Sequence, residues 1–259
     1  MRQHMARTVR SLQQPWRNAA AARRLRREVL DSVAPIPDLT RYERRLCSQN
    51  GEDGILEAIF ARIGTTNRFF VEFGVGNGRR CNTRKLVREG WRGIWIDVHP
   101  VIAPANVTFL NSRVTAENIQ DLFGQAETPE QFDLLSIDID GNDYWVWKAI
   151  TEYRARVVVS EYNASVPPTE ARAIAYDPEF RWNGTDYFGA SLKALADLAA
   201  SKGYVAVGCD SAGVNAFFVL KDLAAGRFAP SPIEALYRPP AYFDGRGHPP
   251  DPERRLTAV

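Results

Sequence analysis

The 259-residue sequence has few cysteines and no long apolar run. Its three cysteines, Cys47, Cys81 and Cys209, lie far apart and form no CxxC pair. This spacing argues against a disulfide framework and favours a reducing compartment, so we expect a cytoplasmic protein. No stretch approaches the roughly 18–20 continuous apolar residues that are needed to span a bilayer.

Extreme composition is also lacking. The chain is 45% apolar and 25% charged, as in an ordinary globular protein. These values exclude the collagen-like, low-complexity and wholly disordered classes. The length fits one large domain or two small ones, at roughly 100–200 residues per domain. A chain of this length can bury a core without disulfides or metals.

Acidic residues are missing from the first 27 residues, which hold eight arginines. Subtracting these eight from the 33 basic residues leaves 25, against 31 acidic ones, so the rest of the chain is net acidic. We interpret residues 1–38 as a basic arm. Three roles are open besides a solvated helix without a partner: a helix on an anionic membrane surface, a transit-peptide-like segment, or a tail on the acidic body. The first would place the protein at the membrane periphery. The acidic body disfavours nucleic acid as a substrate.

Short apolar runs alternate with helical stretches after the arm. The predicted strands cover 69–73, 93–97, 107–110, 134–138 and 157–160. The predicted helices begin near Ser48 and then cover about 82–89, 115–124, 143–153 and 188–202. Apolar runs with little polar alternation, separated by helices, indicate a parallel sheet that is covered on both faces.

A final pair of runs, 204–208 and 216–220, is separated by small and turn residues and predicts an antiparallel hairpin. The expected fold is therefore α/β and doubly wound, with a mostly parallel sheet and a terminal antiparallel hairpin. We expect the folded domain to cover 39–225 and a proline-rich C-terminal tail to cover 226–259.

The strongest motif is a glycine-rich loop after the first strand, Glu72-Phe73-Gly74-Val75-Gly76-Asn77-Gly78. Glycine lets the backbone turn tightly and approach a ligand closely. Asp97 ends the next predicted strand, where a carboxylate can accept both hydroxyls of a ribose. The phosphate-binding pattern GxxxxGK[ST] is absent, and the dinucleotide pattern GxGxxG is not met because Arg79 takes the place of its last glycine.

These segments resemble known enzymes. Glu72–Gly78 resembles motif I of class I S-adenosylmethionine-dependent methyltransferases, and Asp97 stands where their ribose-binding acid belongs. The final hairpin resembles their antiparallel last strand. More narrowly, Ser48-Gln49-Asn50-Gly51-Glu52-Asp53 and Ile137-Asp138-Ile139-Asp140-Gly141 resemble segments of the FkbM-type methyltransferases. This sequence has Asp140 where that family usually has Glu.

The resemblance implies a Rossmann-like methyltransferase fold and methyl transfer from S-adenosylmethionine. The cofactor contacts that it implies are Gln49, Glu72, Gly74, Gly76, Gly78, Asn82, Thr83, Asp97, Thr115 and Asp138. Members of the family methylate hydroxyl groups of sugars. The favoured function is therefore an O-methyltransferase that acts on a sugar or glycan, such as a cell-surface polysaccharide.

Acidic side chains follow the fourth and fifth predicted strands, whose ends open into the same cleft of a doubly wound sheet. The oxygens of Asp138, Glu161 and Asn163 suit Mg²⁺ or Mn²⁺, which would stabilise a sugar alkoxide. The arrangement also resembles the metal-dependent catechol-type O-methyltransferases. Without a metal, Asp138 could contact the cofactor, and Asp140 or Glu161 could act as a general base with a raised pKa. A structural role for these acids is the remaining alternative.

Two other functions stay open at this point. One is a nicotinamide-dependent oxidoreductase and the other is a non-catalytic cofactor-binding domain. The glycine spacing and the final hairpin disfavour the first, and the joint presence of the glycine loop, Asp97 and the acidic cluster disfavours the second. The aromatic and polar segment 180–188 suits a carbohydrate, or packs on itself. We expect His99 to lie near the adenine. A tail that folds over the cleft would bring His248 into the cleft.

Overall fold

The computed structural model describes residues 34–242, 245 and 247–259. The chain divides into two compact units, 1–36 and 37–259, and the elements described below belong to the second. The predicted basic arm lies outside the described residues up to position 33. No helix of the described ranges is long and apolar enough to cross a bilayer.

A seven-stranded sheet with the order β3-β2-β1-β4-β5-β8-β7 organises the second unit. Its strands are β1 (Phe69–Phe73), β2 (Arg92–Asp97), β3 (Val107–Asn111), β4 (Gln131–Ile137), β5 (Arg154–Glu161), β7 (Tyr204–Cys209) and β8 (Asn215–Leu220). The first five strands pair in parallel, and β8 lies antiparallel between β5 and β7. The predicted doubly wound sheet with its antiparallel terminal hairpin is confirmed.

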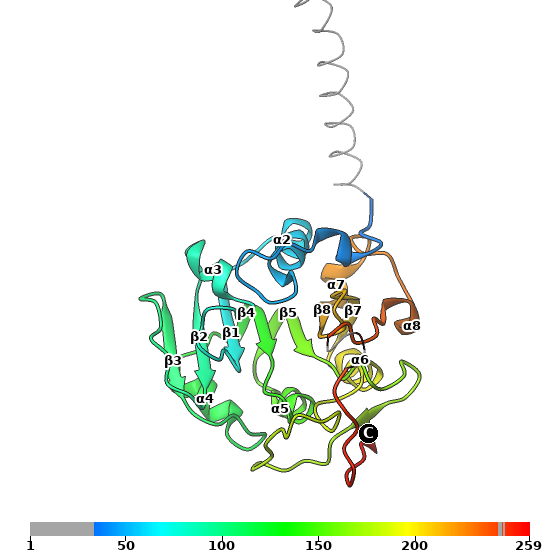
Figure 1. The fold of residues 1–259 in the computed structure, drawn as a ribbon. Helices are drawn as coiled ribbons and strands as arrows, with labels where there is room; N and C mark the ends of the chain where they lie inside the picture. Colours follow the sequence, from blue (N-terminus) through cyan, green and yellow to red (C-terminus); the bar gives the residue numbers. More distant parts are fainter. Residues whose placement is uncertain (1–33, 243–244, 246) are drawn as a thin grey trace, which may run out of the picture. The chain divides into compact units, whose positions relative to one another are not determined.

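Helices cover both faces of this sheet, as Figure 1 shows for α2 and α3 on one side and α4, α5 and α6 on the other. They are α2 (Glu52–Ile63), α3 (Arg84–Arg88), α4 (Ile119–Gln125), α5 (Asp143–Ala149), α6 (Leu192–Ser201) and α7 (Lys221–Ala224), preceded by the 3₁₀ helix η1 (Leu39–Tyr42). Phe123, Trp147 and Leu195 from α4, α5 and α6 share one buried cluster with Val71 and Ile96 of the sheet. This double cover explains why the strands lack polar alternation.

Two helices begin later than their sequence patterns predict, and in each a serine hydroxyl accepts an N–H group of the first turn. Ser191 Oγ accepts the Ala194 N–H at 3.1 Å, so α6 starts at Leu192 and not at 188. The first helix starts at Glu52, after Gly51 in the left-handed region at φ 101°. Ser48 still accepts the Asp53 N–H at 3.1 Å, from a position five residues earlier. The helix starts are thus set by contacts that apolar spacing does not record.

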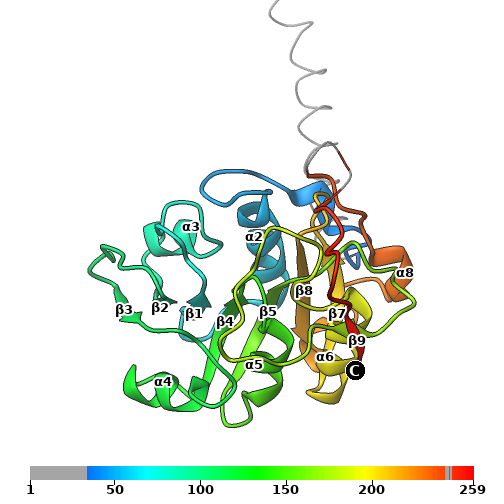
Figure 2. The ribbon, with the colours of Figure 1, turned by 60° about the horizontal axis from the view of Figure 1, so that its bottom comes forward.

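The proline-rich tail carries two short elements, α8 (Ile233–Leu236) and β9 (Thr257–Ala258). Strand β9 pairs antiparallel with β6 (Arg172–Ala173), which lies in the connection between β5 and α6. Figure 2 shows this last segment, in red, ending beside α6. The tail therefore packs on the long connection that follows β5.

Candidate functional site

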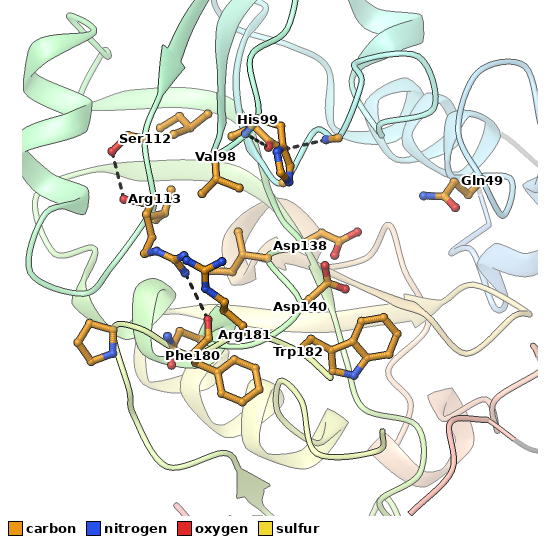
Figure 3. A pocket seen from close by; sticks show the side chains of 18 residues that line it. Gln49, Val98, His99, Ser112, Arg113, Asp138, Asp140, Phe180, Arg181 and Trp182 are labelled. Carbon is orange, nitrogen blue, oxygen red and sulfur yellow. Dashed lines mark hydrogen bonds between the residues drawn. The ribbon is translucent and has the colours of Figure 1, made fainter. Parts of the chain in front are cut away.

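Two neighbouring cavities lie at the carboxyl ends of the parallel strands, where ligands bind in open α/β sheets. The larger has a volume of about 720 Å³ and the smaller about 510 Å³. They share five lining residues, which are Gln49, Gly74, Gly76, Asp138 and Asp140. Both volumes fall within the range of small-molecule sites, roughly 300–1,000 Å³. Figure 3 shows the side chains around the larger cavity.

The three glycines of the loop after β1 have different roles. A Cβ at Gly74 would lie 1.5 Å from the Asp138 carbonyl oxygen, so this glycine lets the ends of β1 and β4 approach. A Cβ at Gly78 would lie 2.8 Å from the Trp95 ring, and Gly78 lines neither cavity. Gly76 has φ 55° and open space in front of it. Of the three, Gly76 is the one with open space beside its backbone, while its N–H is donated to the carboxylate of Asp97.

Glu72 ties the loop to the strand that precedes it. Its side chain is buried and accepts the Asn82 N–H at 2.7 Å and the Thr83 N–H at 3.1 Å. The Thr83 hydroxyl also donates to Glu72, and Ser136 Oγ donates at 3.3 Å. Burial raises the pKa of Glu72 despite these bonds.

Asn82 and Thr83, which donate to Glu72, also hold the glycine loop in place. Thr83 is fully buried, accepts a bond from Trp95 Nε1 at 2.8 Å and lines neither cavity. Asn82 lines the smaller cavity, with its amide donating to Ser136 Oγ at 3.1 Å. Both residues hold the turn after the glycine loop against β1, and only Asn82 borders the cavity space.

Asp97 fixes the loop from the end of β2. Its Oδ2 accepts the Gly76 N–H at 2.8 Å and its Oδ1 accepts the His99 N–H at 2.7 Å. Each carboxylate oxygen can accept a second bond, and Asp97 lines the larger cavity beside Gly76. Its position fits the contact with two ribose hydroxyls that the sequence predicts.

An apolar slot continues from Asp97. Val98, Val114 and Ile139 line the larger cavity together with His99, Ser112 and Arg113. Thr115 was expected here but does not line the cavity. Its N–H donates to Asn118 Oδ1 and its hydroxyl oxygen accepts the Asn118 N–H, just before α4. The slot combines apolar walls with polar edges, as a purine ring requires.

The segment that precedes α2 presents Gln49 to both cavities. Asp53 Oδ2 accepts three backbone N–H groups, from Leu46, Cys47 and Ser48, at 2.9, 2.6 and 2.8 Å. Glu52 accepts the Asn50 N–H at 2.7 Å, and Asn215 Nδ2 at 2.9 Å. The two acids of the Ser-Gln-Asn-Gly-Glu-Asp segment thus hold a turn, whose tip carries Gln49.

Three carboxylates gather where the two cavities meet, Asp138 and Asp140 after β4 and Glu161 at the end of β5. One oxygen of each lies within 4.8 Å of the others. Glu161 Oε2 is buried and accepts no hydrogen bond from the part of the chain that the structure describes. Ion pairs of the described residues lie elsewhere, as at Asp133 with Arg156.

The electrostatics of this cluster are unfavourable without a counter-charge. Burial raises the pKa of Asp138 and Glu161 well above the ordinary values, and the nearby carboxylates of Asp140 and Asp143 add to the rise in both. Burial also raises the pKa of Asp140, and the nearby Asp97 contributes. Such a cluster takes up protons or binds a cation.

Asn163, the third metal ligand that the sequence predicts, lines neither cavity. Its amide nitrogen donates to the carbonyls of Asp186 and Phe188 at 2.7 and 2.9 Å, and its oxygen accepts the Ser165 N–H. The side chain is fully buried and holds the connection after β5. The third carboxylate beside Asp138 and Glu161 is that of Asp140.

Asp143 supports the cluster from the first turn of α5. It is fully buried and accepts the Ile139 and Gly141 N–H groups at 2.9 Å each. These bonds hold the turn in which Asp140 adopts a left-handed conformation, at φ 54°. Burial raises the pKa of Asp143 to about 6.

Sequence reasoning missed several cavity residues. Arg113 and Arg181 both point into the larger cavity in Figure 3, and Tyr242 and Arg80 line the smaller one. Arg80 could have been found from its position two residues after Gly78. Tyr242 carries no local signal, because only the path of the tail brings it to the site. His248, considered from the sequence, also lines the smaller cavity.

No protein-family model matches this chain, and no curated protein matches it either. Solved structures do. A candidate hemolysin from Lactococcus lactis has 14% identity and a TM-score of 0.47, over 74% of this chain and 97% of its own. The 1,6-didemethyltoxoflavin-N1-methyltransferase of Burkholderia thailandensis, bound to S-adenosylhomocysteine, has 12% identity and a TM-score of 0.38, over 63% and 74%. Values this low do not identify a function, which is argued below from the site.

Proposed function

We propose that the protein is an S-adenosylmethionine-dependent methyltransferase whose cofactor lies in the larger cavity. The observation that carries this proposal is the Asp97 carboxylate, held by the Gly76 amide beside open space and an apolar slot. Gly76 and Asp97 would hold the ribose, and Val98 and Ile139 the adenine. When bound, the cofactor supplies a methyl group to an acceptor atom. Gln49 and Asn82, on the side of the smaller cavity, would hold the methionine part.

The acceptor in this proposal is a hydroxyl group of a sugar or glycan. The smaller cavity is lined by hydrogen-bonding groups of many kinds, among them Asn50, Asn77, Arg80 and Tyr242. Such a lining suits a polyol. The segments 48–53 and 137–141, which resemble the FkbM-type methyltransferases, border both cavities and support the same class of acceptor.

The cluster of Asp138, Asp140 and Glu161 would serve the acceptor hydroxyl. With pKa values raised by burial, Asp140 or Glu161 can take up the proton that the hydroxyl loses. The donor set also fits a hard divalent cation, because its three carboxylates lie close together and no described residue donates a hydrogen bond to the buried Glu161 oxygen. A bound Mg²⁺ or Mn²⁺ would supply positive charge that stabilises the alkoxide.

Calorimetry tests the cofactor proposal. The purified chain should bind S-adenosylhomocysteine and not NAD. Asp97→Asn should weaken this binding about tenfold, or about 1.4 kcal/mol, because it removes an acceptor of ribose hydroxyls. Asp121→Asn, at an exposed position of α4, is the matched control and should bind like the wild type. Binding of NAD without binding of S-adenosylhomocysteine would make the proposal wrong.

A further inference from the structure

The C-terminal tail reaches the larger cavity through the segment Phe180–Trp182, which forms one of its walls. We propose that Asp251 and Arg254 are positioning residues, which hold this wall and thereby set how tightly and how long the cofactor is bound. The inference rests on the proposed function, in which the cofactor occupies this cavity. It assigns a role to a segment outside the motifs discussed above.

Asp251 joins the tail to the segment behind the wall. Its carboxylate is 3% exposed and accepts Asn183 Nδ2 at 3.1 Å and Thr185 Oγ1 at 3.0 Å. Its own N–H donates to Asp186 Oδ1 at 2.8 Å, and the Asp186 N–H donates to the Pro249 carbonyl at 2.9 Å. The backbone and the side chain of Asp251 therefore both hold the segment 183–186.

Arg254 adds a second connection, which reaches the wall itself. Its guanidinium donates to Asp251 Oδ2 from Nε at 3.1 Å and from Nη2 at 2.8 Å. Bonds from Arg254 lower the pKa of Asp251, so the pair stays ionised at neutral pH. The same guanidinium lies 4.4 Å from the Tyr187 ring centroid and 5.7 Å from that of Phe180.

Phe180 transmits this contact to the cavity. A Cβ at Gly141 would lie 2.4 Å from the Phe180 ring, so the ring packs on the turn that carries Asp140. The Phe180 carbonyl accepts a bond from Arg113 at 3.3 Å, a contact that Figure 3 shows inside the cavity. The ring is thus held between Arg254 and the turn after β4.

Trp182, the other end of the wall, also contacts the tail. Its indole nitrogen donates to the Thr185 carbonyl at 2.7 Å, and its ring centroid lies 4.5 Å from that of His248. The wall itself has no regular secondary structure. Its position therefore depends on side-chain contacts, two of which come from the tail, Arg254 with Phe180 and His248 with Trp182. Loss of these contacts should let the wall open and the cofactor leave faster.

The test measures S-adenosylhomocysteine binding by calorimetry and its dissociation by stopped flow, together with the melting temperature. Arg254→Ala should raise Kd about tenfold, mainly through koff. Arg254→Lys keeps the charge but loses the two-point contact with Asp251, and should give an intermediate effect. Glu253→Gln is the control, because it removes an adjacent exposed charge that forms no ion pair among the described residues.

Asp251→Asn should weaken binding as Arg254→Ala does, and the double variant should lose less than the sum of the two, because both act through one contact. If Kd and koff are unchanged in these variants, the inference is wrong, even if their melting temperature falls. If Arg254→Ala does not fold, Arg254→Lys decides by the same measurements. A wild-type chain that does not bind S-adenosylhomocysteine would instead refute the proposed function.

Discussion

Two sets of carboxylates lie at the same edge of the sheet and differ in the hydrogen bonds that their oxygens accept. Glu72 and Asp97, at the ends of β1 and β2, accept hydrogen bonds from neighbouring backbone and hydroxyl groups. Asp138, Asp140 and Glu161, after β4 and at the end of β5, lie together, and a buried Glu161 oxygen accepts no hydrogen bond from the described residues. The first set shapes the loops around the cavity. The second set is left for a ligand, a proton or a cation.

The same isosteric change, from a carboxylate to an amide, should affect the stability of the two sets differently. Glu72→Gln places an amide donor against the backbone N–H groups of Asn82 or Thr83, so a buried donor loses its acceptor. Each such group costs about 1–3 kcal/mol, and we expect Glu72→Gln to lose about 3 kcal/mol of unfolding free energy. Glu161→Gln breaks no hydrogen bond of the described residues and removes repulsion between the acids. It should leave stability unchanged or increase it, in chelator. Equal losses in urea unfolding of the two variants would contradict the distinction.

An added divalent cation should stabilise the folded chain through the second set of carboxylates alone. If the second set binds Mg²⁺ or Mn²⁺, the ion stabilises the folded chain by about 2.7 kcal/mol at a concentration of 100 Kd. We therefore expect the melting temperature of the wild type to rise with Mg²⁺ and to return in chelator. Glu161→Gln should abolish the rise, whereas Asp121→Asn should keep it. A wild-type chain that does not respond to either cation would remove the metal and leave Asp140 or Glu161 as the general base.

Much of the fold and the general position of the site follow from the sequence. The apolar runs without polar alternation, separated by helical stretches, indicate a covered parallel sheet, and the turn-rich segment that begins at Cys209 predicts the hairpin. Residues at strand ends, such as Asp97, Asp138 and Glu161, were placed at the site because parallel strands end at one edge.

The roles of individual side chains were harder to predict, because they depend on contacts between distant parts of the chain. Asn163 follows β5 as a ligand would, yet carbonyls more than twenty residues later take up its amide. Gly78 belongs to the glycine motif, yet it faces Trp95 and not a ligand. Arg254 lies far from every motif, and only the fold of the tail brings it to Phe180.

Asp210 is an intermediate case. It tests whether hydrogen bonds alone decide the protonation state of a buried acid. It accepts the Val214 N–H at 3.0 Å and the Asn215 N–H at 2.7 Å, like the first set. Burial nevertheless raises its pKa to about 7, and the nearby Glu52 contributes. Because the folded pKa lies above the ordinary value of 3.8, the folded state binds the additional proton. Its contribution to stability is thus complete below about pH 4 and is lost as the pH rises through about 7.

Between about pH 5.5 and pH 8.5 this loss amounts to about 2 kcal/mol, since one pKa unit corresponds to about 1.4 kcal/mol. Asp210→Asn cannot ionise, so its unfolding free energy should fall less over this range than that of the wild type. Asp121→Asn, again the control, should keep the wild-type dependence. The variant also loses an acceptor for one backbone N–H, and this lowers its stability equally at both pH values. An identical pH dependence in Asp210→Asn and the wild type would show that two backbone hydrogen bonds suffice to keep this acid ionised.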